Sequence, residues 1–94
     1  MSLSKETILA VDDDPISLIF IDKILSPAYN IIKAKDGKEG MNMALQKKPD
    51  LIISDLYMPE VDGDKLAGMT KQHPKLKDVP FNYCYFKQAT KRKN

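Results

Sequence analysis

A short apolar run that stops abruptly on acidic residues constrains the fold of this chain more than any other feature. Residues 7–11, TILAV, are followed by Asp12, Asp13 and Asp14 and then by Pro15. A short run that stays apolar, instead of alternating with polar residues, indicates a strand buried on both faces of a parallel sheet. Asp14 and Pro15 indicate the start of a helix, because aspartate caps the first amides and proline fits the first helical position. The chain is therefore expected to begin with a strand, an acidic turn and a helix.

The same unit of strand and helix recurs along the chain. Pro27 should end the first helix, at about residue 25. Asp36 and Gly37 are predicted to form a turn after the second strand. The expected later elements are a strand at 29–33, a helix at 38–47, a strand at 51–53, a helix at 64–73 and an aromatic-rich strand at 80–86. This alternation predicts an α/β fold, a doubly wound parallel sheet with helices on both faces.

The composition agrees with one small folded domain. The chain has 94 residues, of which 43% are hydrophobic and 30% charged, a balance typical of globular proteins rather than disordered ones. No apolar run approaches the roughly 20 residues that a membrane helix needs. The single cysteine, Cys84, excludes an internal disulfide and suits a reducing compartment. We therefore expect a cytoplasmic domain with no membrane partner.

Charge is distributed unevenly along the chain. Residues 1–63 carry 7 basic and 11 acidic side chains, whereas residues 64–94 carry 8 and 2. The last eight residues, KQATKRKN, hold four of the basic groups. Such a tail could bind nucleic acid or another acidic partner. It lacks interleaved aromatic residues, so the preferred interpretation is a domain at 1–86 and a disordered basic tail at 87–94 that does not bind nucleic acid.

Acidic residues follow two of the expected strands. Asp12 and Asp13 come after the first strand, and Asp55 comes after the third. If these strands are neighbours, the carboxylates converge in the crevice where open α/β sheets bind ligands. Clustered carboxylates repel unless a cation compensates, and oxygen ligands favour Mg²⁺ or Mn²⁺. A carboxylate that faces a bound phosphoryl group can act as a nucleophile. The alternative is that these acids only cap turns and helices, which is the preferred interpretation of Asp14.

Three segments carry a family resemblance. They are ILAVDDDP, PDLIISDLYMPEVDG and HPKLKDVPF, in that order between about residue 7 and residue 81. Together they resemble the receiver domain of two-component response regulators, and the middle segment is the most specific. The resemblance implies a flavodoxin-like strand order and a signalling module rather than an enzyme.

The resemblance also implies roles for individual residues. Asp55 would be the phosphoacceptor, receiving phosphate from a sensor histidine kinase or a phosphotransfer protein. Asp12 and Asp13 match the family's acidic pair, and Mg²⁺ would be held by Asp13, Asp55 and the main-chain carbonyl of Tyr57. Gly63 is expected to allow a backbone conformation that other residues avoid. The loop that turns away from the site would contain Met58, Pro59, Asp62 and Gly63.

The chain departs from the family after the third helix. The position of the family's switch Thr or Ser falls on Tyr85, and the lysine at the end of its fifth strand has no counterpart. Only four of the five βα units are evident, so we expect a truncated or altered C-terminus. Two functions of different classes stay open: a phosphoacceptor in a phosphorelay, and a pseudo-receiver that only binds or dimerises. A phosphohydrolase of the haloacid dehalogenase type fits poorly, because 94 residues leave no room for its other motifs.

Two surfaces are predicted to bind partners. A fourth strand at the sheet edge would favour a homodimer or larger assembly. The first helix has two apolar stripes, of which one should face the sheet, while the other either docks the phosphodonor or packs more core. The stripes are Ile16/Phe20/Ile24 and Leu18/Ile21/Leu25.

Overall fold

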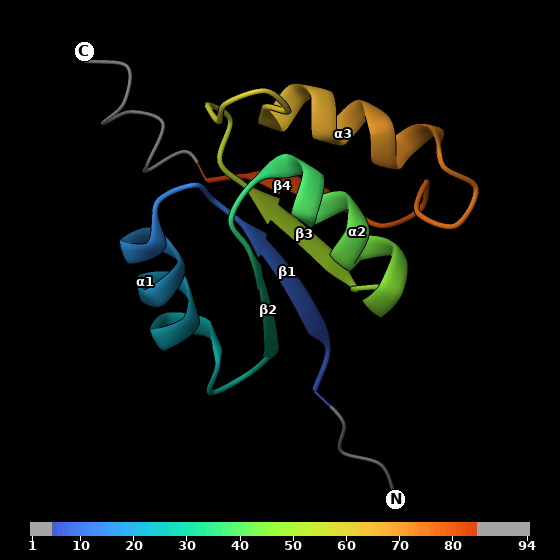
Figure 1. Ribbon diagram of the computed structural model, residues 1–94. Helices are drawn as coiled ribbons and strands as arrows, with labels where there is room; N and C mark the ends of the chain where they lie inside the picture. Colours follow the sequence, from blue (N-terminus) through green and yellow to red (C-terminus); the bar gives the residue numbers. More distant parts are fainter. Residues whose placement is uncertain (1–4, 85–94) are drawn as a thin grey trace, which may run out of the picture.

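The computed structural model describes residues 5–84, which form an α/β fold (Figure 1). Its elements in chain order are β1 (Thr7–Val11), α1 (Pro15–Leu25), β2 (Asn30–Ala34), α2 (Gly37–Lys47), β3 (Leu51–Ser54), α3 (Gly63–Gln72) and β4 (Phe81–Tyr83). The strands form one parallel sheet in the order β2-β1-β3-β4. The predicted α/β class and flavodoxin-like strand order are therefore confirmed. None of the described helices is long and apolar enough to cross a membrane.

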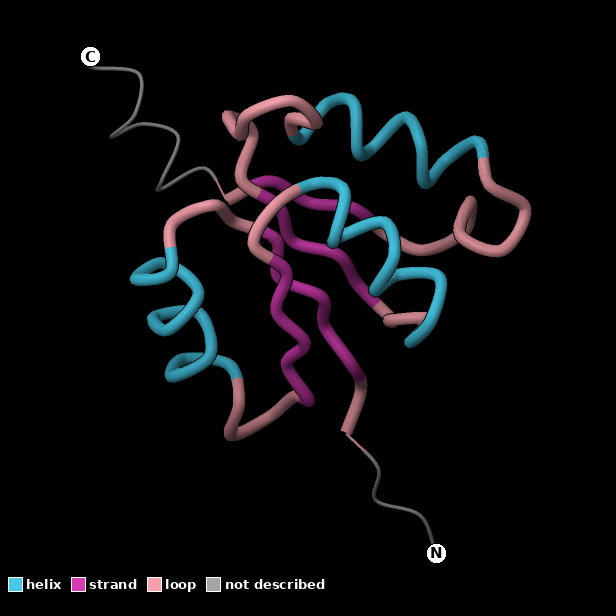
Figure 2. The backbone as a smooth tube through the Cα atoms, viewed as in Figure 1, coloured by secondary structure: helices cyan, strands magenta, loops and turns pink. Residues whose placement is uncertain are grey.

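The helices cover the two faces of the sheet unequally. Figures 1 and 2 show α1 on one side of the sheet and α2 and α3 together on the other. The chain moves outward from β1 to β2, and then returns past β1 to β3 and β4. This reversal makes the sheet doubly wound, as predicted, and its switch point, where open α/β sheets bind ligands, lies at the carboxyl ends of β1 and β3.

The main core lies between the sheet and the layer of α2 and α3. Burying a large apolar side chain there contributes about 1.5–3 kcal/mol. Successive strand residues point to opposite faces, so the other face receives Ile8, which is buried against α1, and Leu51 and Ile53, which are only half-buried. The buried residues of the main core are Leu9, Val11, Ala34, Ala44, Ile52, Met58, Leu66 and Leu76.

Each helix begins after an aspartate. The side chains of Asp14, Asp36 and Asp62 each accept a hydrogen bond from an amide in the first turn of the helix that follows, and such a cap contributes about 1 kcal/mol. The predicted cap at Asp14 is confirmed. The predicted separate turn at Asp36 and Gly37 is wrong, because the Asp36 carboxylate accepts from the Glu39 amide at 2.7 Å and so starts α2 at Gly37.

The last strand is shorter than predicted. β4 has three residues, Phe81–Tyr83, and the Cys84 amide adds one more hydrogen bond, to the carbonyl of Ser54 at 2.9 Å. Residues 85–94, which include the end of the predicted strand, the predicted switch position Tyr85 and the basic tail, lie outside the described residues. Within residues 5–84, β4 is an edge of the sheet, as predicted.

Candidate functional site

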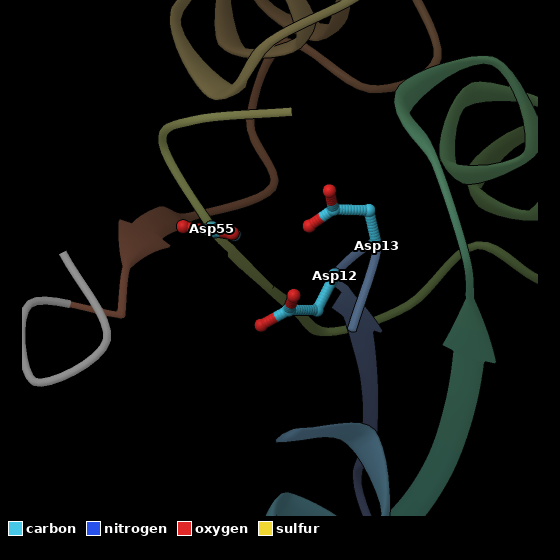
Figure 3. A group of neighbouring side chains, drawn as sticks. All are labelled: Asp12, Asp13 and Asp55. Atoms are coloured by element: carbon cyan, nitrogen blue, oxygen red, sulfur yellow. The ribbon is translucent and has the colours of Figure 1, made fainter. Parts of the chain in front are cut away.

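Three carboxylates meet at the carboxyl ends of β1 and β3. Val11 is paired with Ser54 in the parallel register, so Asp12 and Asp55 follow at the same level. The Asp55 amide also donates to the carbonyl of Val11 at 2.9 Å. Carboxylate oxygens of Asp12, Asp13 and Asp55 lie within 4.8 Å of one another (Figure 3). The predicted convergence of these acids is therefore observed.

The carboxylates differ in their surroundings. Asp12 and Asp55 are each only 1% exposed, whereas Asp13 is exposed. Asp12 accepts from the Asp14 amide at 2.9 Å, and Asp55 accepts from the Tyr57 amide at 3.4 Å. These bonds show that both buried acids stabilise the turns after their strands. Stabilising a turn accounts for the hydrogen bond to each buried carboxylate. It does not explain why three carboxylates, which repel one another when charged, lie in one place.

The donor set fits a hard divalent cation. Every ligand atom in the group is a carboxylate oxygen, and Mg²⁺ and Mn²⁺ prefer oxygen ligands while keeping some of their waters. Two of the carboxylates are held by the ends of adjacent strands, so their positions are set by the sheet and not by flexible side chains alone. A cation there would offset the repulsion between the acids.

The loop from Asp55 to Gly63 connects the site to α3. Met58 anchors it in the main core, where it is 7% exposed, and the Gly63 amide donates to the Leu56 carbonyl at 2.8 Å. Glu60 adopts a φ of 65°, a conformation that few residues other than glycine adopt. The loop is therefore compact and closed at its base by a backbone hydrogen bond.

The reason predicted for the glycine at position 63, an unusual backbone conformation, is wrong. No glycine among residues 5–84 has a positive φ, so Gly63 does not need an unusual backbone conformation. A Cβ on Gly63 would instead lie 2.5 Å from the Asp55 carbonyl oxygen and 2.8 Å from the Cα of Leu56. The start of α3 thus approaches the backbone of the site so closely that a side chain does not fit.

One residue pair beside the site was not predicted. The Tyr83 hydroxyl, at the end of β4, donates to the Asp64 carboxylate in the first turn of α3. These residues are 19 positions apart, and no periodicity or motif joins them. Only the packing of β4 beside β3 brings them together.

Comparison with known proteins identifies the family. The model of the response regulator receiver domain matches residues 8–83. The chain belongs to this family. A receiver domain is a signalling module rather than a classical enzyme, in agreement with the expectation from the sequence.

Relatives at the sequence level are longer than this chain. Histidine kinase P4 of Formosa agariphila is 41% identical over 76 residues, which are 81% of this chain and 6% of that protein. The polar-differentiation response regulator DivK of Brucella anthropi is 29% identical over 76 residues, 80% of this chain and 62% of that protein. The chain thus spans a small part of the kinase and about three-fifths of DivK.

Solved receiver domains share the fold. The chemotaxis response regulator CheY4 of Vibrio cholerae gives a TM-score of 0.80 at 27% identity, over 85% of this chain and 68% of that one. The Mn²⁺-bound response regulator Rcp1 gives a TM-score of 0.74 at 27% identity, over 83% and 63%. A receiver domain of a sensor histidine kinase of Pseudomonas aeruginosa has Mg²⁺ coordinated in its active-site cleft, and it gives a TM-score of 0.79 at 25% identity, over 85% and 66%.

Proposed function

We propose that this chain is a phosphoacceptor module of a two-component phosphorelay, and that Asp55 accepts the phosphoryl group. The donor would be a phosphohistidine of a sensor kinase or phosphotransfer protein in the cytoplasm. The observation that carries the proposal is the meeting of Asp12, Asp13 and Asp55 within 4.8 Å at the carboxyl edge of the sheet. Two solved relatives with Mg²⁺ or Mn²⁺ bound support the same chemistry here.

In the proposed reaction, a carboxylate oxygen of Asp55 attacks the phosphorus of the phosphohistidine. The P–N bond breaks, the imidazole leaves with the electron pair and takes a proton, and an acyl phosphate forms on Asp55. The Tyr57 amide, which donates to Asp55, helps to orient the carboxylate for this attack. Burial of Asp55 limits the access of bulk water to the site.

The metal would be held by Asp13, Asp55 and the main-chain carbonyl of Tyr57, with Asp12 completing the acidic pocket. Mg²⁺, when bound, neutralises charge on the phosphoryl oxygens. The loop residues Met58, Pro59, Asp62 and Gly63 hold the Tyr57 segment, because the Met58 side chain is buried and the Gly63 amide closes the loop.

The phosphodonor would dock on α1. Ile16, Phe20 and Ile24 form a stripe at helical spacing and are 73%, 57% and 58% exposed. The second predicted stripe faces the protein, since Leu18 is buried and Ile21 and Leu25 are half-buried. α1 begins just after the acidic pair, so a partner bound to this stripe would lie next to Asp55.

A second candidate function is a pseudo-receiver that associates without phosphate chemistry. The observation in its favour is that β4 is an edge of the sheet within residues 5–84, and an edge strand can pair with a strand of a second chain. We expect a homodimer or larger assembly through this edge. Sedimentation at micromolar concentration measures it, and a stable monomer contradicts it.

Phosphorylation by a small donor tests the first function. The wild-type protein with acetyl phosphate and Mg²⁺ should gain one phosphoryl group, measured by intact mass, and Asp55→Asn should gain none. Asp78→Asn is the matched control, because Asp78 is exposed and lies in the turn before β4. If the wild type gains no phosphate while folded, the pseudo-receiver function replaces the phosphoacceptor.

A further inference from the structure

A tyrosine on the edge strand reaches across to the helix that follows the site. The Tyr83 hydroxyl lies 2.5 Å from a carboxylate oxygen of Asp64. A hydrogen bond from a hydroxyl to an ionised carboxylate is short and about twice as strong as a bond between neutral groups. It ties the carboxyl end of β4 to the first turn of α3.

The ring of Tyr83 packs against the same turn. The Cβ that would be added at Gly63 lies 3.0 Å from the Cε1 atom of Tyr83 and 2.5 Å from the Asp55 carbonyl oxygen. The tyrosine ring therefore covers one side of Gly63, and the backbone of Asp55 and Leu56 lies on another. Gly63 in turn donates its amide to the Leu56 carbonyl at 2.8 Å. Tyr83, Gly63 and the Asp55–Leu56 peptide form one continuous contact.

The same end of the loop is also in contact with α2. A Cβ added at Gly37 would meet the carbonyl oxygen and side chain of Val61, so these two backbones are in close contact. The loop from Asp55 to Gly63 is therefore held at Val61 by α2 and at Gly63 by Tyr83. β4 contributes Tyr83 to this contact through side-chain atoms alone, so a point substitution can remove it.

We propose that Tyr83 is a positioning residue for the acidic site. By holding Gly63 and Asp64 against the peptide after Asp55, it sets the direction of the Asp55 carboxylate and of the Tyr57 segment. The proposal extends the proposed function, because it concerns the same site. It predicts that the hydroxyl of Tyr83, which donates to Asp64 at the start of α3, affects metal affinity through the loop.

Tyr83→Phe isolates the hydroxyl. The variant keeps the ring and its edge-to-face contact with Phe81, whose centroid lies 5.6 Å away. We expect the Gly63 amide to exchange with solvent about tenfold faster, since one charge-assisted bond that holds its turn is lost. We expect Mg²⁺ affinity to fall about tenfold, the lower end of the effect of removing an outer partner of a metal ligand.

Two substitutions of Asp64 test whether the hydrogen bond between Tyr83 and Asp64, and not some other property of Tyr83, causes these effects. Asp64→Asn keeps an acceptor for the hydroxyl but loses its charge, so its effect should lie between those of the wild type and Tyr83→Phe, whereas Asp64→Ala should reproduce Tyr83→Phe. The double variant Tyr83→Phe/Asp64→Ala should lose no more than either single one. Tyr29→Phe is the matched control, because Tyr29 lies beside the opposite end of the sheet, next to Asp50 and Leu51.

The measurements are amide hydrogen exchange of the folded chain and calorimetric titration with Mg²⁺ alone. If Tyr83→Phe matches Tyr29→Phe in Gly63 exchange and in Mg²⁺ affinity, the proposal is overturned. A fall in urea stability without faster local exchange at Gly63 also overturns it. Failure of the wild type to take up phosphate refutes the proposed function only, because exchange at Gly63 still reports whether Tyr83 holds the loop.

Discussion

The two faces of the sheet are built from the same strands but differ in how they are covered. On the face of α2 and α3, Leu9, Val11 and Ile52 are at most 1% exposed. On the face of α1, Leu51 and Ile53 stay half-buried. We call these the closed face and the open face. Both come from continuous apolar runs, so the difference lies in the helices and not in the strands.

The open face also has cavities. One of about 290 Å³ is lined by α1 residues and Cys84, and one of about 240 Å³ lies between α1 and the start of the sheet, beside Ile8 and Leu51. Central strands of a parallel sheet are normally covered on both faces. Within residues 5–84, α1 alone covers the open face, and it packs on β1 and β2. Within the described residues, the closed face therefore supplies most of the stability.

The sharpest test of this difference uses neighbouring isoleucines on β3. Ile52→Ala removes a fully buried side chain from the closed face and should lower the free energy of unfolding by about 4 kcal/mol, whereas Ile53→Ala on the open face should cost about 1–2 kcal/mol. Urea denaturation followed by circular dichroism measures both. Equal losses would show that the open face is as well packed as the closed one.

A second test uses two glycines of α3, the helix that covers the closed face beside the site. Gly63→Ala should lower the free energy of unfolding by about 2 kcal/mol or more, because its methyl group would meet the backbone of Asp55 and Leu56. Gly68→Ala meets nothing within 4 Å and should stabilise the helix by about 0.5–1 kcal/mol. Thermal unfolding of the two variants measures these changes in the free energy of unfolding. A harmless Gly63→Ala would show that α3 can move away from the site.

The closed face and the acidic site were predictable because they follow from periodicity and topology. Apolar runs ending on Asp12 and Asp55 define two strands, and parallel neighbours bring their carboxyl ends to one edge of the sheet. The caps of the helices follow from single aspartates at the right positions, as at Asp14. These inferences need only local sequence and one topological rule.

What was missed depends on contacts between distant segments. Gly63 in the sequence signals that a side chain is not tolerated, but it does not say whether conformation or close approach is the reason. Glu60 in a left-handed conformation has no sequence signal, since the residue is not one that favours it. The bond between Tyr83 and Asp64 depends on the exact register of β4 beside β3, which aromatic content alone does not define.

The smallest expected effect on stability comes from the exposed stripe of α1, next to the open face. Phe20→Ser should change the free energy of unfolding by less than about 0.5 kcal/mol, because the side chain is 57% exposed. Leu18→Ser, two residues away and 8% exposed, should prevent stable folding. Circular dichroism during urea denaturation distinguishes them.

The effect of Phe20→Ser on phosphorylation distinguishes a role of Phe20 in docking the phosphodonor from a role in the chemistry of the acidic site. Labelling by acetyl phosphate should match the wild type, because a small donor needs no docking surface. Transfer from a phosphorylated histidine phosphotransfer domain that labels the wild type should slow by about tenfold, the effect of losing about 1.4 kcal/mol of binding. If both donors are equally affected, Phe20 influences the acidic site itself. If neither is affected, the donor binds elsewhere and the exposed stripe is not its docking surface.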